Sequence, residues 1–185
     1  MRPFAVLAVA VALFPTLSTL PMMAQEHRSG TAPEIEALSV APAFDNLGDH
    51  HRTISTYLPQ AQRYFDQGLR LMFAFNLEEA ERSFRAAVAI DPTCAICSWG
   101  VALALGPHIN FPATPERTVA ANAAAAEALR RAGSVTPVER ALIEAVALRY
   151  SDPAPATPEA QAALDQAYAA AMRAAAKAFP GDADV

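Results

Sequence analysis

The residues best suited to chemistry in this chain are Cys94 and Cys97, the only two cysteines among its 185 residues. They form a C-x-x-C pattern at the predicted start of a helix, where backbone N–H groups and the helix dipole lower the pKa of a thiol. Such a pair can close a short disulfide, exchange with other thiols or ligate a metal ion. The simplest interpretation is structural: a disulfide, or two small residues buried in a helix contact.

The other two interpretations need more than the cysteine pair. A thiol-redox role lacks the strand–helix context of thioredoxin-like folds. A metal site needs further ligands, and His50, His51 and His108 are candidates because thiolate and imidazole suit copper or zinc. Covalent c-type haem is excluded, since Ser98 stands where the C-x-x-C-H motif requires histidine. A metal-binding or thiol-redox accessory protein is therefore the alternative function.

Composition and missing motifs exclude several other classes. The sequence contains no G-x-S-x-G, no H-E-x-x-H and no glycine-rich phosphate loop. Its net charge of -5 gives no basic face for nucleic acid. A hydrophobic share of 53% with 18% charged residues excludes a disordered chain. We expect a folded protein that is not an enzyme and does not bind nucleic acid.

Residues 1–24 have the layout of a secretory signal peptide. Arg2 supplies a positive charge, residues 4–14 form an apolar run, and no charged residue occurs between positions 3 and 24. The run is too short to span a bilayer, and Pro15 and Pro21 interrupt the residues after it. We expect cleavage after Ala24 and a bacterial product that is periplasmic or secreted, without a membrane span, in an oxidising compartment.

The elements that must position the cysteines and histidines are helices. Residues 25–57 mix glycine, proline and short apolar pieces, and we interpret them as a linker or extended segment. Beyond them, apolar residues recur at helical spacing, and Pro, Gly and capping residues mark the ends. Six helices are predicted, at 59–75, 77–90, 93–105, 115–133, 137–150 and 158–179. No stretch alternates like a strand, so the fold class is all-α, with antiparallel helix pairs joined by short turns.

The last residues, 180–185, have the pattern of a turn followed by the first residues of another helix. A helical repeat array closes with a polar capping helix, and the sequence does not provide one. We favour a domain truncated at its C-terminal end over a frayed tail. An enzymatic region beyond residue 185 is left open.

Five residues follow the spacing G-x11-A-x3-F-x2-A-x4-P: Gly68, Ala80, Phe84, Ala87 and Pro92. This spacing resembles the tetratricopeptide repeat (TPR), a 34-residue helix–turn–helix unit. The small residues stand where two helices approach closely, and Phe84 stands where the second helix reaches the next unit. The later windows depart from the pattern, chiefly through the long loop 107–114. Residues 64–110 are also similar to the N-terminal part of longer exported bacterial TPR proteins of unsettled function.

The resemblance implies a right-handed solenoid of antiparallel helix pairs over residues 58–185, with a concave groove for peptides or protein partners. It implies binding rather than catalysis, and no cofactor. Arg63, Arg70 and Asn76 are the candidate groove contacts. The expected function is an exported, non-enzymatic TPR-type scaffold.

Overall fold

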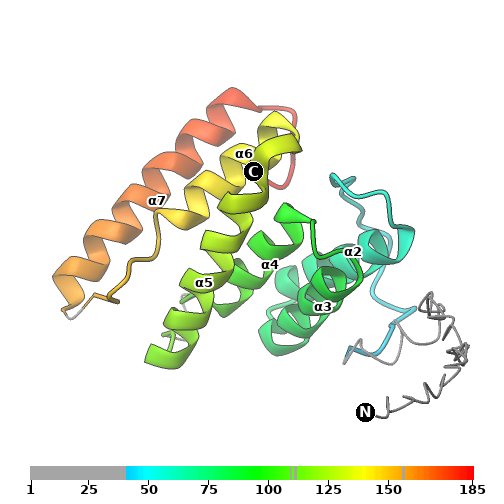
Figure 1. Ribbon diagram of the computed structural model, residues 1–185, viewed down its shortest axis with the longest axis horizontal. Coiled ribbons are helices and arrows are strands. Elements are labelled where there is room, and N and C mark those ends of the chain that lie inside the picture. The colour runs from blue at the N-terminus through cyan, green and yellow to red at the C-terminus, as the bar shows by residue number, and fades with distance from the viewer. Residues whose placement is uncertain (1–40, 109, 111, 156) are drawn as a thin grey trace, which may run out of the picture.

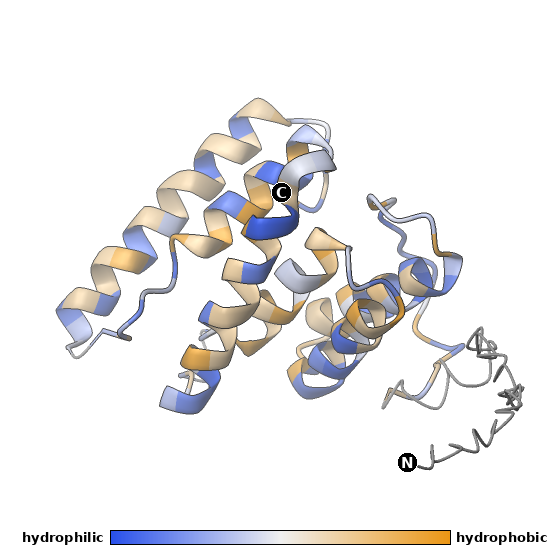
Figure 2. Ribbon diagram, in the orientation of Figure 1, coloured by the Kyte–Doolittle hydropathy of each residue, from blue (hydrophilic) through white to orange (hydrophobic). Residues whose placement is uncertain are grey.

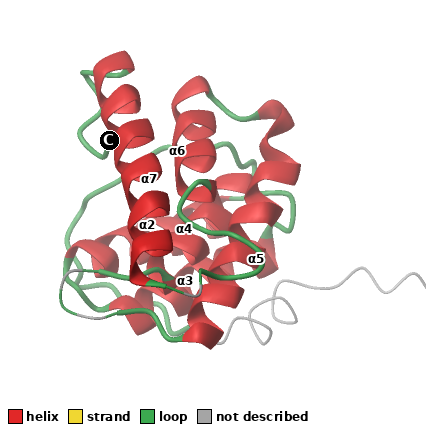
Figure 3. Ribbon diagram, turned by 90° about the vertical axis from the view of Figure 1, so that its left-hand side faces the viewer, coloured by secondary structure: helices red, strands yellow, loops and turns green. Residues whose placement is uncertain are grey.

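The computed structural model describes residues 41–108, 110, 112–155 and 157–185. Its helices are α2 (Pro59–Phe73), α3 (Leu77–Ile90), α4 (Ala95–Leu105), α5 (Pro115–Arg131), α6 (Pro137–Ala147) and α7 (Pro158–Ala178), and a 3-10 turn, η1 (Ala132–Ser134), follows α5 (Figure 1). No β-strand occurs in these described ranges (Figure 3). The predicted all-α class and six helices are confirmed. The predicted signal peptide, residues 1–24, and residues 25–40 lie outside the described residues.

Local capping chemistry fixes most of the helix starts. Thr114, Thr136 and Thr157 precede α5, α6 and α7, and each side chain accepts a hydrogen bond from the backbone three residues later. Glu139 completes the predicted capping box by bonding back to the backbone N–H of Thr136. Helix α4 begins two residues later than predicted because Cys94 is its N-cap.

Consecutive helices pack in pairs, α2 with α3, α4 with α5 and α6 with α7 (Figures 1 and 3). Helix α4 also packs on α2, α3 and α6, so it joins the three pairs. Every residue of α4 except Leu103 is buried. In Figure 2, α3 carries both hydrophilic and hydrophobic residues, as expected for a helix that is buried on one side.

The first two pairs meet at Phe84 of α3, whose side chain is fully buried. A Cβ added to Gly68 of α2 would lie 2.6 Å from its ring, and one added to Gly100 of α4 would also collide with it. The glycines therefore allow α2 and α4 to approach the same aromatic ring. The predicted role of Gly68 and Phe84 in close helix packing is confirmed, and Gly100 is an additional contact.

Residues 41–57 have no regular secondary structure, and they lie on the helices rather than separating two domains. Ala41 and Ile54 are part of the core. Residues 180–185, predicted as a turn followed by the start of another helix, form turns and no helix. With Phe179 they make the C-terminal tail, which lies near the same segment. Across the described ranges, no helix combines the length and the apolar character that crossing a membrane requires.

Candidate functional site

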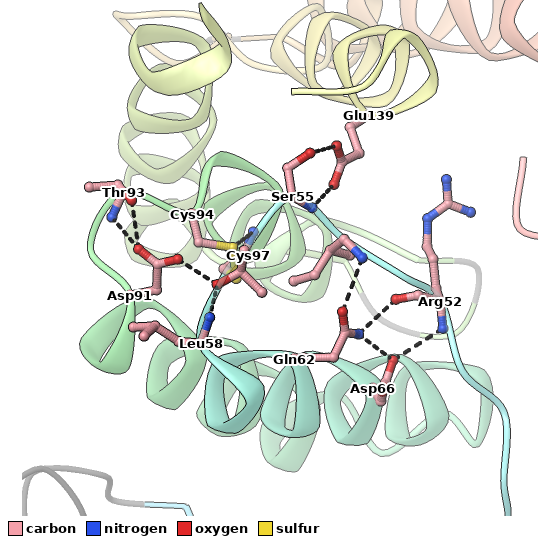
Figure 4. Close-up of a disulfide and its surroundings, with 12 residues drawn as sticks. Arg52, Ser55, Leu58, Gln62, Asp66, Asp91, Thr93, Cys94, Cys97 and Glu139 are labelled. Atoms are coloured by element: carbon pink, nitrogen blue, oxygen red, sulfur yellow. Dashed lines mark hydrogen bonds between the residues drawn. A yellow bond between two sulfur atoms is a disulfide. The ribbon is translucent and has the colours of Figure 1, made fainter. Parts of the chain in front are cut away.

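Cys94 and Cys97 are joined in a disulfide at the start of α4 (Figure 4). The Sγ atom of Cys94 also accepts a hydrogen bond from the N–H of Cys97, 3.2 Å away. The two residues are only 1% and 0% exposed. Because thiol–disulfide exchange requires a thiolate to reach a sulfur atom, this burial favours a structural bridge over an exchanging one.

The three histidines lie among different partners. His50 Nε2 is 3.0 Å from Asp184 Oδ1, and His51 Nδ1 is 2.7 Å from Asp66 Oδ2. His108 Nδ1 accepts a hydrogen bond from the N–H of Asn110. In the part of the chain that the structure describes, no group of three or more His, Cys, Asp or Glu side chains is arranged to hold a metal ion. The structure therefore does not bring the predicted cysteine and histidine ligands together.

What the structure does bring together is an irregular, non-helical piece of chain and a row of polar side chains on α2. We call residues 41–57 the N-terminal segment. Its first part is held by Gln67, whose amide accepts from Phe44 N–H at 2.8 Å and donates to the carbonyl of Pro42 at 2.8 Å. Tyr64 Oη donates to the carbonyl of Ala41 at 3.1 Å. All three bonds engage backbone groups of the segment.

Gln62, about one turn earlier on α2, and Asp66, next to Gln67, hold the next part in the same way. The Gln62 amide accepts from Ile54 N–H at 3.0 Å and donates to the Arg52 carbonyl at 2.8 Å, as a neighbouring β-strand would. Asp66 Oδ1 accepts from Arg52 N–H at 3.1 Å. Arg70 Nε donates to the carbonyl of His50 at 2.7 Å. Figure 4 shows Gln62 and Asp66 pointing from their helix toward Arg52.

The opposite side of the segment is bound through its hydroxyl residues. Glu139 of α6, only 1% exposed, accepts from both Ser55 N–H at 2.8 Å and Ser55 Oγ at 2.5 Å. Thr56 Oγ1 donates to Asp91 Oδ2 at 2.6 Å. Burial alone would raise the pKa of Asp91, but hydrogen bonds from Thr56 and from Thr93 outweigh it and hold that pKa below its usual value.

Arg52 ties the segment to the C-terminal tail. Its guanidinium makes two bonds to Asp182, at 2.6 and 2.9 Å, and one to Asp184 at 3.1 Å. Burial alone would lower the pKa of Arg52, but its bonds to the two carboxylates raise it, and the bond to Arg52 lowers the pKa of Asp182. The Arg52 side chain is 8% exposed and those of Asp182 and Asp184 are 20% and 14% exposed, so this is a partly buried group of one cation and two anions.

The N-terminal segment and the tail cover the helices incompletely. A cavity of about 110 Å³ remains between the helices and these two parts of the chain. Side chains from α2, α4, α6, α7, the segment and the tail line it: Leu69, Met72, Phe73, Trp99, Leu103, Leu142, Tyr168, Met172, Arg52 and Asp184. We call this surface, with the polar residues of α2 and Glu139 beside it, the inner face. Trp99 Nε1 and Arg52 Nε are buried without a hydrogen-bond partner in the described structure.

Two of the three predicted groove residues contact the N-terminal segment. Arg63 pairs with Asp45 at 3.0 Å, and Arg70 bonds to the His50 carbonyl. Asn76 is exposed at the start of α3 and makes no side-chain capping bond in this described region. Arg63 and Arg70 therefore lie beside the N-terminal segment, and the role of all three residues in binding a partner stays a prediction.

Sequence reasoning missed the residues that hold the segment most directly: Gln62, Asp66, Gln67, Asp91 and Glu139. Asp66 and Gln67 stand inside the apolar stripe of α2, and both are buried, at 6% and 3% exposure. Polar residues in such a stripe need buried partners, and this requirement is the signal that could have found them. The sequence indicates Glu139 only as a capping residue. Its second role depends on Ser55, which is 84 residues away in the chain.

The chain matches no protein-family model, no curated protein and no solved structure.

Proposed function

We propose that this protein is an exported, non-enzymatic TPR-type scaffold that binds a protein or peptide partner in extended form on its inner face. The observation that carries the proposal is the set of side chains on α2 and α6 that bind backbone groups of Arg52, Ile54 and Ser55. The stacked helix pairs are compatible with a right-handed TPR-like solenoid. Export rests on the signal-peptide pattern of residues 1–24.

The chemistry of the inner face suits peptides better than small substrates. Gln62 and Gln67 each present a donor and an acceptor to main-chain groups, which every extended peptide carries. Main-chain hydrogen bonds supply affinity in this mode, and pockets for individual side chains supply specificity. The nearby acids, Glu139, Asp182 and Asp184, favour a partner with basic or hydroxyl side chains.

Site-specific photocrosslinking in the native envelope tests this function. A benzoylphenylalanine in place of Arg63 or Arg70 lies beside the segment, and one in place of Arg82 lies on the exposed side of α3 as the matched control. We expect the first two positions to capture the same partner, and the Arg82 position not to capture it. Equal capture at all three positions, or none at Arg63 and Arg70, would contradict the proposal.

A further inference from the structure

We infer that residues 50–57 are a built-in ligand of the inner face and that the partner displaces them with an extended segment of the same chemical pattern. The pattern is a basic residue, an apolar residue two positions later, and hydroxyl residues at the next two positions. In this chain Arg52, Ile54, Ser55 and Thr56 supply it. The inference rests on the proposed peptide-binding function and adds the class of partner and its regulation.

The segment is bound as a ligand would be. The N–H groups of Arg52, Ile54 and Ser55 each donate to a helix side chain, and the carbonyls of His50 and Arg52 each accept from one. The segment adds no turn of helix to the array, and its bonds run along α2 and across to α6 (Figure 4). A peptide from another molecule offers the same main-chain groups.

Three side chains of the segment enter distinct environments. Arg52 lies between the Asp182 and Asp184 carboxylates. Ile54 is 5% exposed in the core. Ser55 Oγ donates to Glu139, a charge-assisted bond of the stronger kind. These environments define which residues a competing segment must carry, and an acidic residue at the Arg52 position would be repelled by two carboxylates.

The built-in ligand fits imperfectly. The cavity of about 110 Å³ beneath Arg52 leaves Trp99, Leu69 and Leu142 without full packing on one side. The indole N–H of Trp99 has no acceptor in the described structure, which is costly for a buried donor. A partner segment with a bulkier side chain here can gain contacts that the chain's own segment does not make.

Competition between the tethered segment and an added peptide sets the apparent affinity of that peptide. A tethered ligand is present at an effective concentration on the order of millimolar, so a peptide added to the wild-type chain binds only the small open fraction. Weakening the built-in ligand should therefore strengthen binding of the free peptide. This inverse relation distinguishes a displaceable ligand from an integral part of the fold.

The test uses the full chain and a fluorescein-labelled peptide of residues 47–57 (LGDHHRTISTY). Ser55→Ala removes the hydroxyl bond to Glu139. Thr118→Ala, which removes a hydroxyl bond to the carbonyl of Thr114 at the start of α5, is the matched control. We expect fluorescence anisotropy to give about tenfold or greater tightening for Ser55→Ala over the wild type, because hydrogen bonds to charged groups are the stronger ones. Thr118→Ala should bind like the wild type. A peptide with alanine at the Arg52 position should bind Ser55→Ala at least about tenfold more weakly.

Equal affinities for wild type and Ser55→Ala overturn the inference. So does the absence of saturable binding to a Ser55→Ala chain that keeps its helical circular dichroism and a cooperative unfolding transition. Either result can be distinguished from a failure of the proposed scaffold function. Crosslinking at Arg63 and Arg70 does not depend on the segment's sequence, so a captured partner without peptide binding would leave the scaffold function in place and remove only the built-in ligand.

Discussion

Glu139 shows how one carboxylate can join local and distant structure. It caps α6 by accepting from Thr136 N–H at 2.9 Å, and it accepts two further bonds from Ser55. A carboxylate has enough lone pairs for all of these bonds, whereas an amide offers only one acceptor oxygen. Since the group is 1% exposed, water cannot replace a lost partner.

We therefore expect Glu139→Gln to lower the free energy of unfolding by about 1–3 kcal/mol, the cost of leaving buried hydrogen-bonding groups unsatisfied. Urea denaturation followed by circular dichroism measures it. Glu144→Gln, at an exposed position of the same helix, is the control and should change the free energy by less than about 0.5 kcal/mol. Similar losses in both variants would show that Glu139 has no special role.

At the scale of elements, the sequence predicted the helices well because the residues that determine each helix end lie close to it in the chain. The Thr-Pro starts of α5, α6 and α7 and the Gly-Pro after α4 lie within a turn of the ends that they determine. The N-terminal segment could not be predicted in this way. Its contact between Arg52 and Asp182 joins residues 130 positions apart, and neither residue carries a local pattern that names the other.

The end of α2 departs from the usual chemistry of helix ends. Phe75 adopts a φ of 60°, and the N–H of Asn76 bonds to the carbonyl of Leu71, as in the motif in which this position is commonly glycine. The phenylalanine is 68% exposed, so it contributes little burial in return for the strained backbone.

We expect Phe75→Gly to raise the free energy of unfolding by about 0.5–1 kcal/mol, because glycine adopts a positive φ without steric cost. Ala74→Gly is the matched control at the preceding residue, whose φ is -83°. It should instead lower stability, because glycine increases the backbone entropy of the unfolded chain. Thermal unfolding compares the two. A destabilised Phe75→Gly chain would mean that the ring makes stabilising contacts.

The disulfide acts on α4 as an element. It closes a four-residue loop, Cys94 to Cys97, for which the chain-entropy model gives about 2 kcal/mol. We expect the double variant Cys94→Ser, Cys97→Ser to lose up to that amount and to keep its fold, because serine can still cap the helix. Urea denaturation measures the loss. A copper or zinc ion retained by purified wild type and lost in the double variant would instead favour the metal-binding alternative.

At the scale of the whole molecule, the N-terminal segment links distant parts of the chain. It contacts α2, the end of α3 through Asp91, the start of α6 through Glu139 and the C-terminal tail through Arg52. Release of the segment would therefore remove contacts at both ends of the helix array. Two of these links depend on carboxylates whose pKa values are lowered, Asp91 and Asp182.

This arrangement predicts a loss of stability in acid. A carboxyl group whose pKa is lowered in the folded state stabilises the fold at pH values above its pKa in the unfolded chain, which is about 4. This contribution disappears as the pH falls through the lower pKa of the folded state. We expect the free energy of unfolding to fall below about pH 4, and Asp182→Asn to show a shallower fall. Asp49→Asn, at an exposed position of the segment, is the control and should follow the wild type. Parallel pH profiles for all three chains would exclude the contribution of Asp182.

The central claim is that the N-terminal segment is a ligand of the helices and not a fixed part of them. Native-state hydrogen exchange tests it most directly, because it reports the opening free energy of each amide. The informative amides are those of Arg52, Ile54 and Ser55, which donate to Asp66, Gln62 and Glu139.

We predict that these three amides exchange through a local opening, at a lower free energy than the core amides of α3 and α4 and with little dependence on denaturant. Exchange at the same free energy and with the same denaturant dependence as the helix core would contradict the account, because the segment would then leave the inner face only when the whole protein unfolds.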